Sequence, residues 1–408
     1  MKVTVRYRAD PDLPPVGVLA SDARGRIFFE YDAEWRAHGL ELSPILLPLS
    51  KTGSFTTSDP GFSQLFGLFD DSLPDWWGQR IMRLHFEEMN IPWNEVGPLE
   101  KLACQGSFTL GALSYEPDLA PKHYRETITT EVALLLNSAR HLMRGESGEI
   151  IPALIRGGLS PGGAQPKALL AFNDDFSKVL AGGGAAPDGF SRWLMKFQID
   201  PEDHLCRQEH AIARMAAEAG IRVPETRLFH TADGAAHFLS RRFDLDDGGP
   251  RHLHSYAGLT HTAVHELIDY ADLLDLTRDL TARETEVEEM FRRAVFNIGI
   301  ANDDDHSRNH SFLMDGSGEW MLSPAYDMTR SGYALGSGYR AAGLQGKFSK
   351  IGIADLRAAA AAHAIRRPDV IISSVLDAIR RWPEFAEEAG IPSTETKLLH
   401  DEFPASHW

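Results

Sequence analysis

The stretch NDDDHSRNHSFLMD, residues 302–315, decides how the chain is interpreted, because three consecutive aspartates stand beside a histidine and two asparagines. A calcium-binding loop would need a glycine at its sixth position and a glutamate at its twelfth. Counted from Asp303, those positions hold Arg308 and Met314, so a calcium loop is excluded. A solvated acidic turn and a catalytic centre both remain open.

The spacing within this stretch favours phosphoryl transfer. Protein kinases place a catalytic aspartate five residues before an asparagine that binds magnesium, in a loop that follows a buried helix. Of the three aspartates, only Asp304 has an asparagine at that offset, namely Asn309. The spacing therefore predicts Asp304 as the catalytic residue and Asn309 as a metal ligand.

A second magnesium carboxylate is expected after a short β-hairpin. Two apolar segments flank the turn sequence DGSG, residues 315–318, and Asp327 follows them. Asp327 is the candidate ligand. The alternative is that Asp327 only caps the next element.

Lys196 is the candidate cation for nucleotide phosphates. It lies in the apolar sequence WLMKF, where an unpaired lysine would be costly to bury. We expect Glu209, on the following predicted helix, to pair with it. The alternative is a lysine at the edge of a strand that extends its ammonium into water.

A glycine-rich segment, SPGGAQPK at residues 160–167, precedes the strand that leads to Lys196. It is not a Walker A loop, since the Gly-Lys-Ser/Thr sequence is missing. Its backbone N–H groups could still cover phosphates.

Composition indicates a folded protein and disfavours direct binding of nucleic acid, although a basic patch formed in three dimensions stays open. The 408 residues carry a net charge of −17 without a dense basic run, which disfavours direct contact with DNA or RNA. Cys104 and Cys206 are expected to be reduced, packed thiols of a cytoplasmic protein. No signal peptide and no membrane span are expected.

The pattern along the chain predicts an α+β fold in three parts. Residues 1–118 are strand-rich with one helix at 74–89. Residues 119–245 run loop, strand, strand, helix, strand, strand, with the helix ending at Gly220. Residues 246–408 are mostly helical, and a helix over 285–302, with Thr285 as N-cap and Glu288 as its capping-box partner, leads into the acidic stretch.

Several motifs together resemble the HipA family, the kinase-like toxins of bacterial toxin–antitoxin pairs. They are FDDSLPDWWGQRI, GSFTLGALSY, SPGGAQPK, FLSRRFD, NDDDHSRNHSFL and LSPAYDM, and they extend over most of the chain. The resemblance implies a two-lobed protein-kinase-like fold with a β-rich N-terminal subdomain and a mostly helical C-terminal lobe.

The resemblance also implies roles for individual residues. Asp304 would be catalytic, Asn309 and Asp327 would bind Mg²⁺, and Ser160 would be autophosphorylated, which would place negative charge where ATP phosphates dock. Arg241 departs from the family pattern, which has an acidic residue before Arg-Phe-Asp. The residues implied to contact ATP are Ser160, Gly162, Gly163, Ala164, Gln165, Lys167, Lys196, Arg241, Phe243, His306 and Asn309.

The function implied by the resemblance is that of an ATP- and Mg²⁺-dependent serine/threonine protein kinase toxin. Its target would be a translation-related protein such as an aminoacyl-tRNA synthetase. A small helix-turn-helix antitoxin would neutralise it and carry the DNA contact, with no membrane involved. Two alternatives stay open: a non-catalytic nucleotide-binding regulator of the same fold, and a small-molecule kinase.

Overall fold

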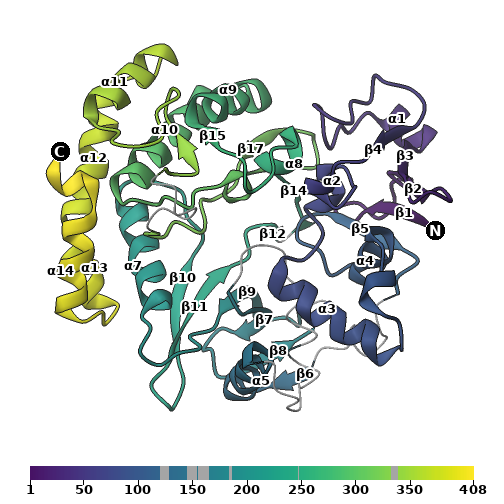
Figure 1. The fold of residues 1–408 in the computed structure, drawn as a ribbon, viewed down its shortest axis with the longest axis horizontal. Helices are drawn as coiled ribbons and strands as arrows, with labels where there is room; N and C mark the ends of the chain where they lie inside the picture. Colours follow the sequence, from purple (N-terminus) through teal and green to yellow (C-terminus); the bar gives the residue numbers. More distant parts are fainter. Residues whose placement is uncertain (120–127, 145–153, 155–164, 183–185, 247, 332–338) are drawn as a thin grey trace.

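The computed structural model describes residues 1–119, 128–144, 154, 165–182, 186–246, 248–331 and 339–408 (Figure 1). The fold is α+β, as the sequence predicts. Figure 1 shows the N-terminal elements and the C-terminal helices on opposite sides of the molecule, with a sheet from the middle of the chain between them. The boundaries after residues 118 and 245 stay a prediction.

The N-terminal part is built on a five-stranded antiparallel sheet in the order β4-β3-β2-β1-β5. Alternating burial along β1 places Val3, Val5 and Tyr7 in the core. The elements are β1 (Lys2–Tyr7), β2 (Gly17–Ser21), β3 (Ile27–Tyr31), α1 (Ala33–His38), β4 (Phe55–Thr57), α2 (Gly67–Asp70), α3 (Trp76–Glu88), α4 (Pro98–Gln105) and β5 (Leu113–Glu116).

The middle part is a six-stranded antiparallel sheet in the order β10-β11-β9-β7-β8-β6. Its elements are β6 (Ile128–Thr130), α5 (Val132–Arg144), β7 (Lys167–Asn173), β8 (Val179–Ala181), β9 (Phe190–Lys196), α7 (Leu205–Glu218), β10 (Thr226–His230) and β11 (Ala236–Arg241). Gly220 has a φ of +83°, as expected for the glycine that ends a helix. The sequence prediction missed β6 and α5.

The C-terminal part is mostly helical around the buried helix α10. Twelve of the sixteen residues of α10 are buried, so this helix crosses the core. The elements are β12 (Leu245–Asp246), β13 (Gly249–Pro250), β14 (His252–Ser255), α8 (Tyr256–Thr260), β15 (Ile268–Asp269), α9 (Tyr270–Thr281), α10 (Glu284–Gly299), β16 (Ser311–Met314), β17 (Trp320–Leu322), β18 (Ala342–Gly343), α11 (Ile353–Ala362), α12 (Pro368–Arg380), α13 (Trp382–Glu388) and α14 (Ser393–Glu402).

The predicted N-cap of α10 is wrong. The helix begins at Glu284 after Arg283, and no side chain caps it. Tertiary contacts hold its first turn instead, because Glu286 pairs with the Arg222 guanidinium and accepts the Leu322 N–H at 3.0 Å. The predicted hairpin is correct, since β16 and β17 pair antiparallel.

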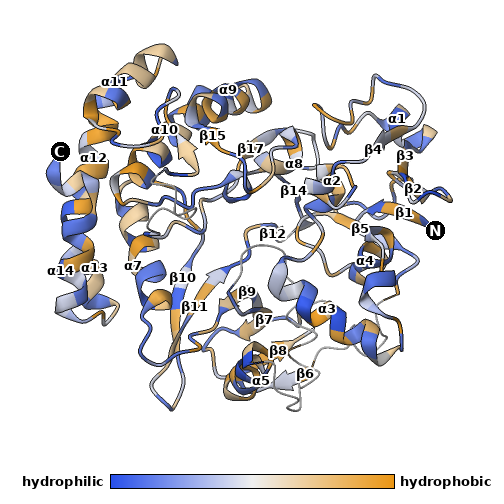
Figure 2. Cartoon of the chain, in the orientation of Figure 1, coloured by the Kyte–Doolittle hydropathy of each residue, from blue (hydrophilic) through white to orange (hydrophobic). Residues whose placement is uncertain are grey.

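Two hydrophobic clusters divide the molecule along an unexpected line. Helix α3 joins the middle sheet in one cluster through Trp77 and Ile81. Helix α7 joins the C-terminal helices in the other through Ile212 and Met215. Figure 2 shows hydrophobic and hydrophilic residues interleaved along α3, as expected for a helix with one buried face.

Cys104 and Cys206 are both free and buried, as predicted. Among the described helices, none has the length and apolar character needed to cross a bilayer.

Candidate functional site

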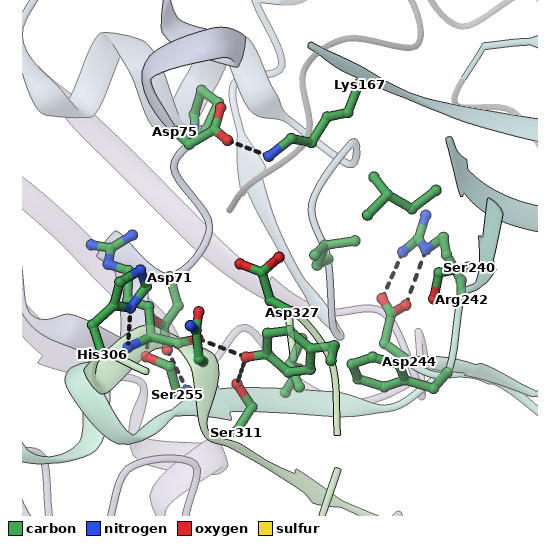
Figure 3. Close-up of a pocket in the computed structure, with 18 of the residues that line it drawn as sticks. Asp71, Asp75, Lys167, Ser240, Arg242, Asp244, Ser255, His306, Ser311 and Asp327 are labelled. Carbon is green, nitrogen blue, oxygen red and sulfur yellow. Dashed lines mark hydrogen bonds and ion pairs between the residues drawn. The ribbon is translucent and has the colours of Figure 1, made fainter. Parts of the chain in front are cut away.

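A cavity of about 820 Å³ opens where the three parts of the chain meet. The middle sheet, the segments after α10 and the region around α3 all contribute to its walls (Figure 3). This volume is typical of a site for a small molecule or cofactor. The predicted site residues that line it are Gln165, Lys167, Lys196, Arg241, Phe243, Asp304, His306, Asn309 and Asp327.

Lys196, the last residue of β9, is buried and doubly paired. Its Nζ lies 2.7 Å from Glu209 Oε1 and 2.5 Å from Asp327 Oδ1. Burial works against its charge, but the two carboxylates outweigh burial and raise the pKa of Lys196. The expected pairing with Glu209 is confirmed, and the alternative of a lysine extending into water is wrong.

Asp304 is exposed toward the cavity at the start of the loop that follows α10. Its main chain is fixed, because its N–H donates to Ser331 Oγ at 2.9 Å and its carbonyl accepts the Asn309 Nδ2 at 3.1 Å. The Asp304 carbonyl also accepts the His306 N–H at 2.8 Å. Residues five apart in sequence are therefore neighbours in space, as the kinase spacing requires.

The environment of Asp304 suits proton transfer. Removal from water raises the pKa of the Asp304 carboxyl; His306 acts in the opposite direction, while the negative charge of Asp327 adds to the rise. A carboxylate with a raised pKa accepts a proton more readily at neutral pH.

The two neighbouring aspartates are buried and serve other contacts. Asp305 accepts hydrogen bonds from the Tyr270 hydroxyl and from Asn297 Nδ2, and its Oδ1 lies 3.0 Å from His310 Nε2. Asp303 is also buried, and its carbonyl accepts the Ala341 N–H at 2.8 Å. The picture of a freely solvated acidic turn is therefore wrong for this loop.

Asp327 lies between His306 and Arg242 in the view of Figure 3, and its backbone is left-handed, with a φ of +55°. Lys196 lowers the pKa of Asp327 to about 2, so the carboxylate is ionised at neutral pH. The Asp327 carboxylate accepts from the Lys196 ammonium, and among the described residues it accepts no backbone N–H of a following helix. Its observed contact therefore does not match the alternative of a simple cap.

The donors present fit a magnesium ion that is shared with phosphates. Asp327 offers a carboxylate oxygen, and Asn309 offers its Oδ1, since the hydrogen bond to the Asp304 carbonyl uses only its Nδ2. The described residues contain no cluster of three or more His, Cys, Asp or Glu side chains able to hold a metal. Mg²⁺ commonly takes one or two protein ligands and completes its shell with water and phosphate oxygens.

The segment after β11 carries Arg242 and Asp244, which lie on the right in Figure 3, below Lys167. The Phe243 ring stacks on Tyr326 with ring centroids 5.7 Å apart. The N–H groups of Arg241 and Arg242 donate to carbonyls of Glu225 and Arg192. These two N–H groups are therefore already used within the sheet, and the exposed Arg241 guanidinium lies 3.6 Å from the Glu225 carboxylate.

Only part of the glycine-rich segment can be placed. Gln165 and Lys167 line the cavity. Ser160, Gly162, Gly163 and Ala164 lie outside the described residues.

Comparison with known proteins assigns the family. Residues 159–403 match the family model described as the HipA-like C-terminal domain, and residues 12–116 match the HipA N-terminal domain. The chain belongs to the HipA family.

Individual relatives of this HipA-family chain are distant. A protein named "Putative kinase" from Haemophilus influenzae is 26% identical over 186 residues, which is 42% of this chain and 52% of that protein. The chain thus spans about half the length of that relative. "Putative kinase Y4mE" from Sinorhizobium fredii is 26% identical over 336 residues, covering 77% of this chain and 74% of that protein.

A solved chain from the complex of the Shewanella oneidensis MR-1 toxin–antitoxin system, which contains HipA, HipB and operator DNA, superposes with a TM-score of 0.68. The alignment covers 98% of this chain and 94% of that chain at 19% identity. It shows that the two chains share a fold along almost their whole length. The predicted kinase-like α+β fold is therefore confirmed.

The HipA-family N-terminal subdomain supplies cavity residues that the sequence analysis did not single out. Asp70 pairs with Arg308, which stands next to Asn309, and Asp71 accepts the Ser255 N–H at 2.8 Å. Helix α2 approaches α8 closely: a Cβ built on Gly67 would lie 2.2 Å from the Gly258 carbonyl oxygen. Both residues lie in the motif FDDSLPDWWGQRI, residues 69–81, which carries part of the family resemblance.

Proposed function

We propose that this chain is an ATP- and Mg²⁺-dependent serine/threonine protein kinase that acts as the toxin of a toxin–antitoxin pair. The observation that carries the proposal is the convergence of Lys196, Glu209, Asp304, Asn309 and Asp327 on one cavity. Each residue has a role in the general scheme of phosphoryl transfer by kinases. Membership of the HipA family supports the same function.

In this proposal the chain's own residues position the nucleotide and move one proton. Lys196, held by Glu209, would contact ATP phosphates. Asn309 and Asp327 would hold Mg²⁺, which when bound neutralises charge on the transferred phosphoryl group. Asp304 would orient the acceptor hydroxyl and take its proton.

The acceptors in the proposal are a translation-related protein, such as an aminoacyl-tRNA synthetase, and Ser160 of the chain itself. A phosphate on Ser160 would repel ATP phosphates and weaken nucleotide binding. The proposed partner is a small helix-turn-helix antitoxin that makes the DNA contact. The likeness in fold to a chain from a HipA–HipB–DNA complex supports a HipB-like partner.

Labelling with γ-³²P-ATP and Mg²⁺ tests the proposal. The wild-type chain should label Ser160, and Asp304→Asn should reduce transfer by about 10²–10⁴-fold while ATP still binds. Ser160→Ala should lose the label on the chain but keep transfer to the target, which phosphosite mapping after induction would name.

The same experiment separates the alternatives. A non-catalytic regulator would bind ATP without any transfer. A small-molecule kinase would consume ATP only with a metabolite pool and would leave the proteome unlabelled. Either outcome would overturn the protein kinase assignment.

A further inference from the structure

Two lysines stand side by side in the cavity. Lys167, the first residue of β7, is the direct cross-strand partner of Lys196, the last residue of β9. Opposed residues of an antiparallel pair project from the same face of the sheet, and like charges there repel each other. Each lysine therefore requires its own counter-charge.

The two counter-charges come from different parts of the chain. Lys196 pairs with Glu209 and Asp327 of the kinase lobes. Lys167 pairs with Asp75 of the N-terminal subdomain, whose Oδ2 lies 2.7 Å from the Lys167 Nζ (Figure 3). The side chains of this second pair are only 1% and 10% exposed, so water screens it weakly.

Helix α3 holds Lys167 at two points. Asp75 is the N-cap of α3, and its Oδ1 accepts the Gly78 N–H at 2.9 Å while Oδ2 faces the lysine. The indole N–H of the buried Trp77 donates to the Lys167 carbonyl at 2.8 Å. The N-terminal subdomain thus fixes both the main chain and the ammonium of Lys167.

We propose that Asp75 is a positioning residue for the nucleotide site: it keeps Lys167 charged and in place, so the N-terminal subdomain completes the phosphate-binding end of the cavity. The inference rests on the proposed function, because it takes the phosphates of ATP as the ligand. Asp75 has no role in the kinase scheme described above. Through Asp75, the N-terminal subdomain would contribute directly to the nucleotide site and would not merely lie beside it.

The charges around Lys167 should make ATP binding depend on pH in a way that Asp75 controls. Burial lowers the pKa of Lys167, Asp75 opposes this, and Lys196 lowers it further. Asp327 and Glu209 also face Lys167 and favour its charged form. Without the Asp75 charge, Lys167 should lose its proton at a lower pH than in the wild type.

The test is Asp75→Asn, measured by calorimetric binding of ATP and of AMP. Asparagine caps helices as well as aspartate does, so the start of α3 is preserved while the charge is removed. We expect ATP to bind roughly tenfold to a hundredfold more weakly, and AMP, which lacks the outer phosphates, to change by less than about twofold. The loss for ATP should grow as pH rises, because without the Asp75 charge Lys167 gives up its proton at a lower pH than in the wild type.

Two further variants make the test specific. Asp32→Asn removes the same charge at the N-cap of α1, where Asp32 accepts the Glu34 N–H at 2.8 Å, and should leave ATP binding unchanged. In a Lys167→Met background, Asp75→Asn should cause no further loss of ATP affinity. This double variant removes the buried lysine together with the charge of Asp75, so it also serves if Asp75→Asn alone folds poorly.

Equal losses for ATP and AMP, an unaltered pH profile, or an additional loss in the Lys167→Met background would each overturn the positioning role. A wild-type chain that does not bind ATP would overturn the proposed function, and this inference with it. Wild-type ATP binding that Asp75→Asn retains in full would overturn the inference alone.

Discussion

Lys196 Nζ and Asp327 Oδ1 lie 2.5 Å apart although 131 positions separate them in the sequence. In the proposed kinase these two groups have different partners, since the lysine contacts phosphates and the aspartate binds Mg²⁺. The ion pair therefore occupies the place that the nucleotide and its metal would share. When Mg-ATP binds, the contact between Lys196 and Asp327 should be replaced by two others, Lys196 with a phosphate and Asp327 with Mg²⁺.

Asp327→Asn should remove the effect of magnesium on nucleotide affinity. In the wild type, Mg²⁺ should strengthen ATP binding, because Asp327 and Asn309 supply oxygen ligands. In the variant, ATP affinity should be nearly the same with Mg²⁺ as with EDTA, as measured by calorimetry. Asp401→Asn, at an exposed site, is the control and should keep the full magnesium effect. A magnesium effect that survives in Asp327→Asn would exclude Asp327 as a ligand.

The contribution of the Asp327 carboxylate to the unfolding free energy should be lost at acid pH. Lys196 lowers the pKa of Asp327 to about 2, below the value of an unfolded aspartate at about 4. A group with a lowered folded pKa stabilises the fold above its unfolded pKa and loses that contribution as pH falls through the folded one. Urea unfolding of the wild type and of Asp327→Asn should therefore converge as pH falls from about 4 to about 2. If the difference in unfolding free energy between the wild type and Asp327→Asn stayed constant from about pH 4 to about pH 2, the pairing of Asp327 with Lys196 would be contradicted.

Lys196→Met should destabilise the fold as well as abolish ATP binding. The change leaves Glu209, which is only 4% exposed, without its cation, and removing one partner of a buried pair costs about 3–5 kcal/mol. Chemical denaturation measures this loss. Lys347→Met is a matched control, because Lys347 pairs with Asp355 at 42% and 32% exposure and such pairs contribute at most about 1 kcal/mol.

The adjacent aspartates should separate stability from activity. Asp305→Asn breaks buried contacts to Tyr270, Asn297 and His310 and should cost about 1.5–3 kcal/mol of unfolding free energy. Asp304→Asn, at an exposed position, should leave the unfolding free energy within about 0.5 kcal/mol while it removes transfer. Comparable stability losses in both variants would mean that the triplet acts as one structural unit.

Residue spacing within short segments predicted the centre of the site. Contacts between residues far apart in the sequence were not predicted. Asp304 and Asn309 share one loop, and the hairpin before Asp327 has a strong turn signal, so both could be read from neighbouring residues. The pairing of Lys196 with Glu209 followed because a buried lysine needs a carboxylate. Asp70 meets Arg308 across 238 positions, and no local pattern encodes such a contact.

Residues 1–118 hold the helices α1, α2 and α4 besides the single predicted one, and two other errors along the chain have different physical causes. Tertiary contacts of Glu286 set the start of α10 and overrode the capping signal at Thr285. Helix α5 was overlooked although Val132, Leu135, Leu136 and Ala139 follow helical spacing.

The boundary between the two hydrophobic clusters passes through the site. Glu209 is carried by α7, which packs with the C-terminal helices, and Arg207 on the same helix donates to the Ala389 carbonyl at 2.8 Å. Lys196 belongs to the sheet, whose neighbouring strands pack in the other cluster. Helix α7 also contacts β10 and β11 of the sheet, so Glu209 stands between the two clusters. The Lys196–Glu209 ion pair joins an element of one cluster to an element of the other, so the charge pair that serves the site also ties the two clusters together.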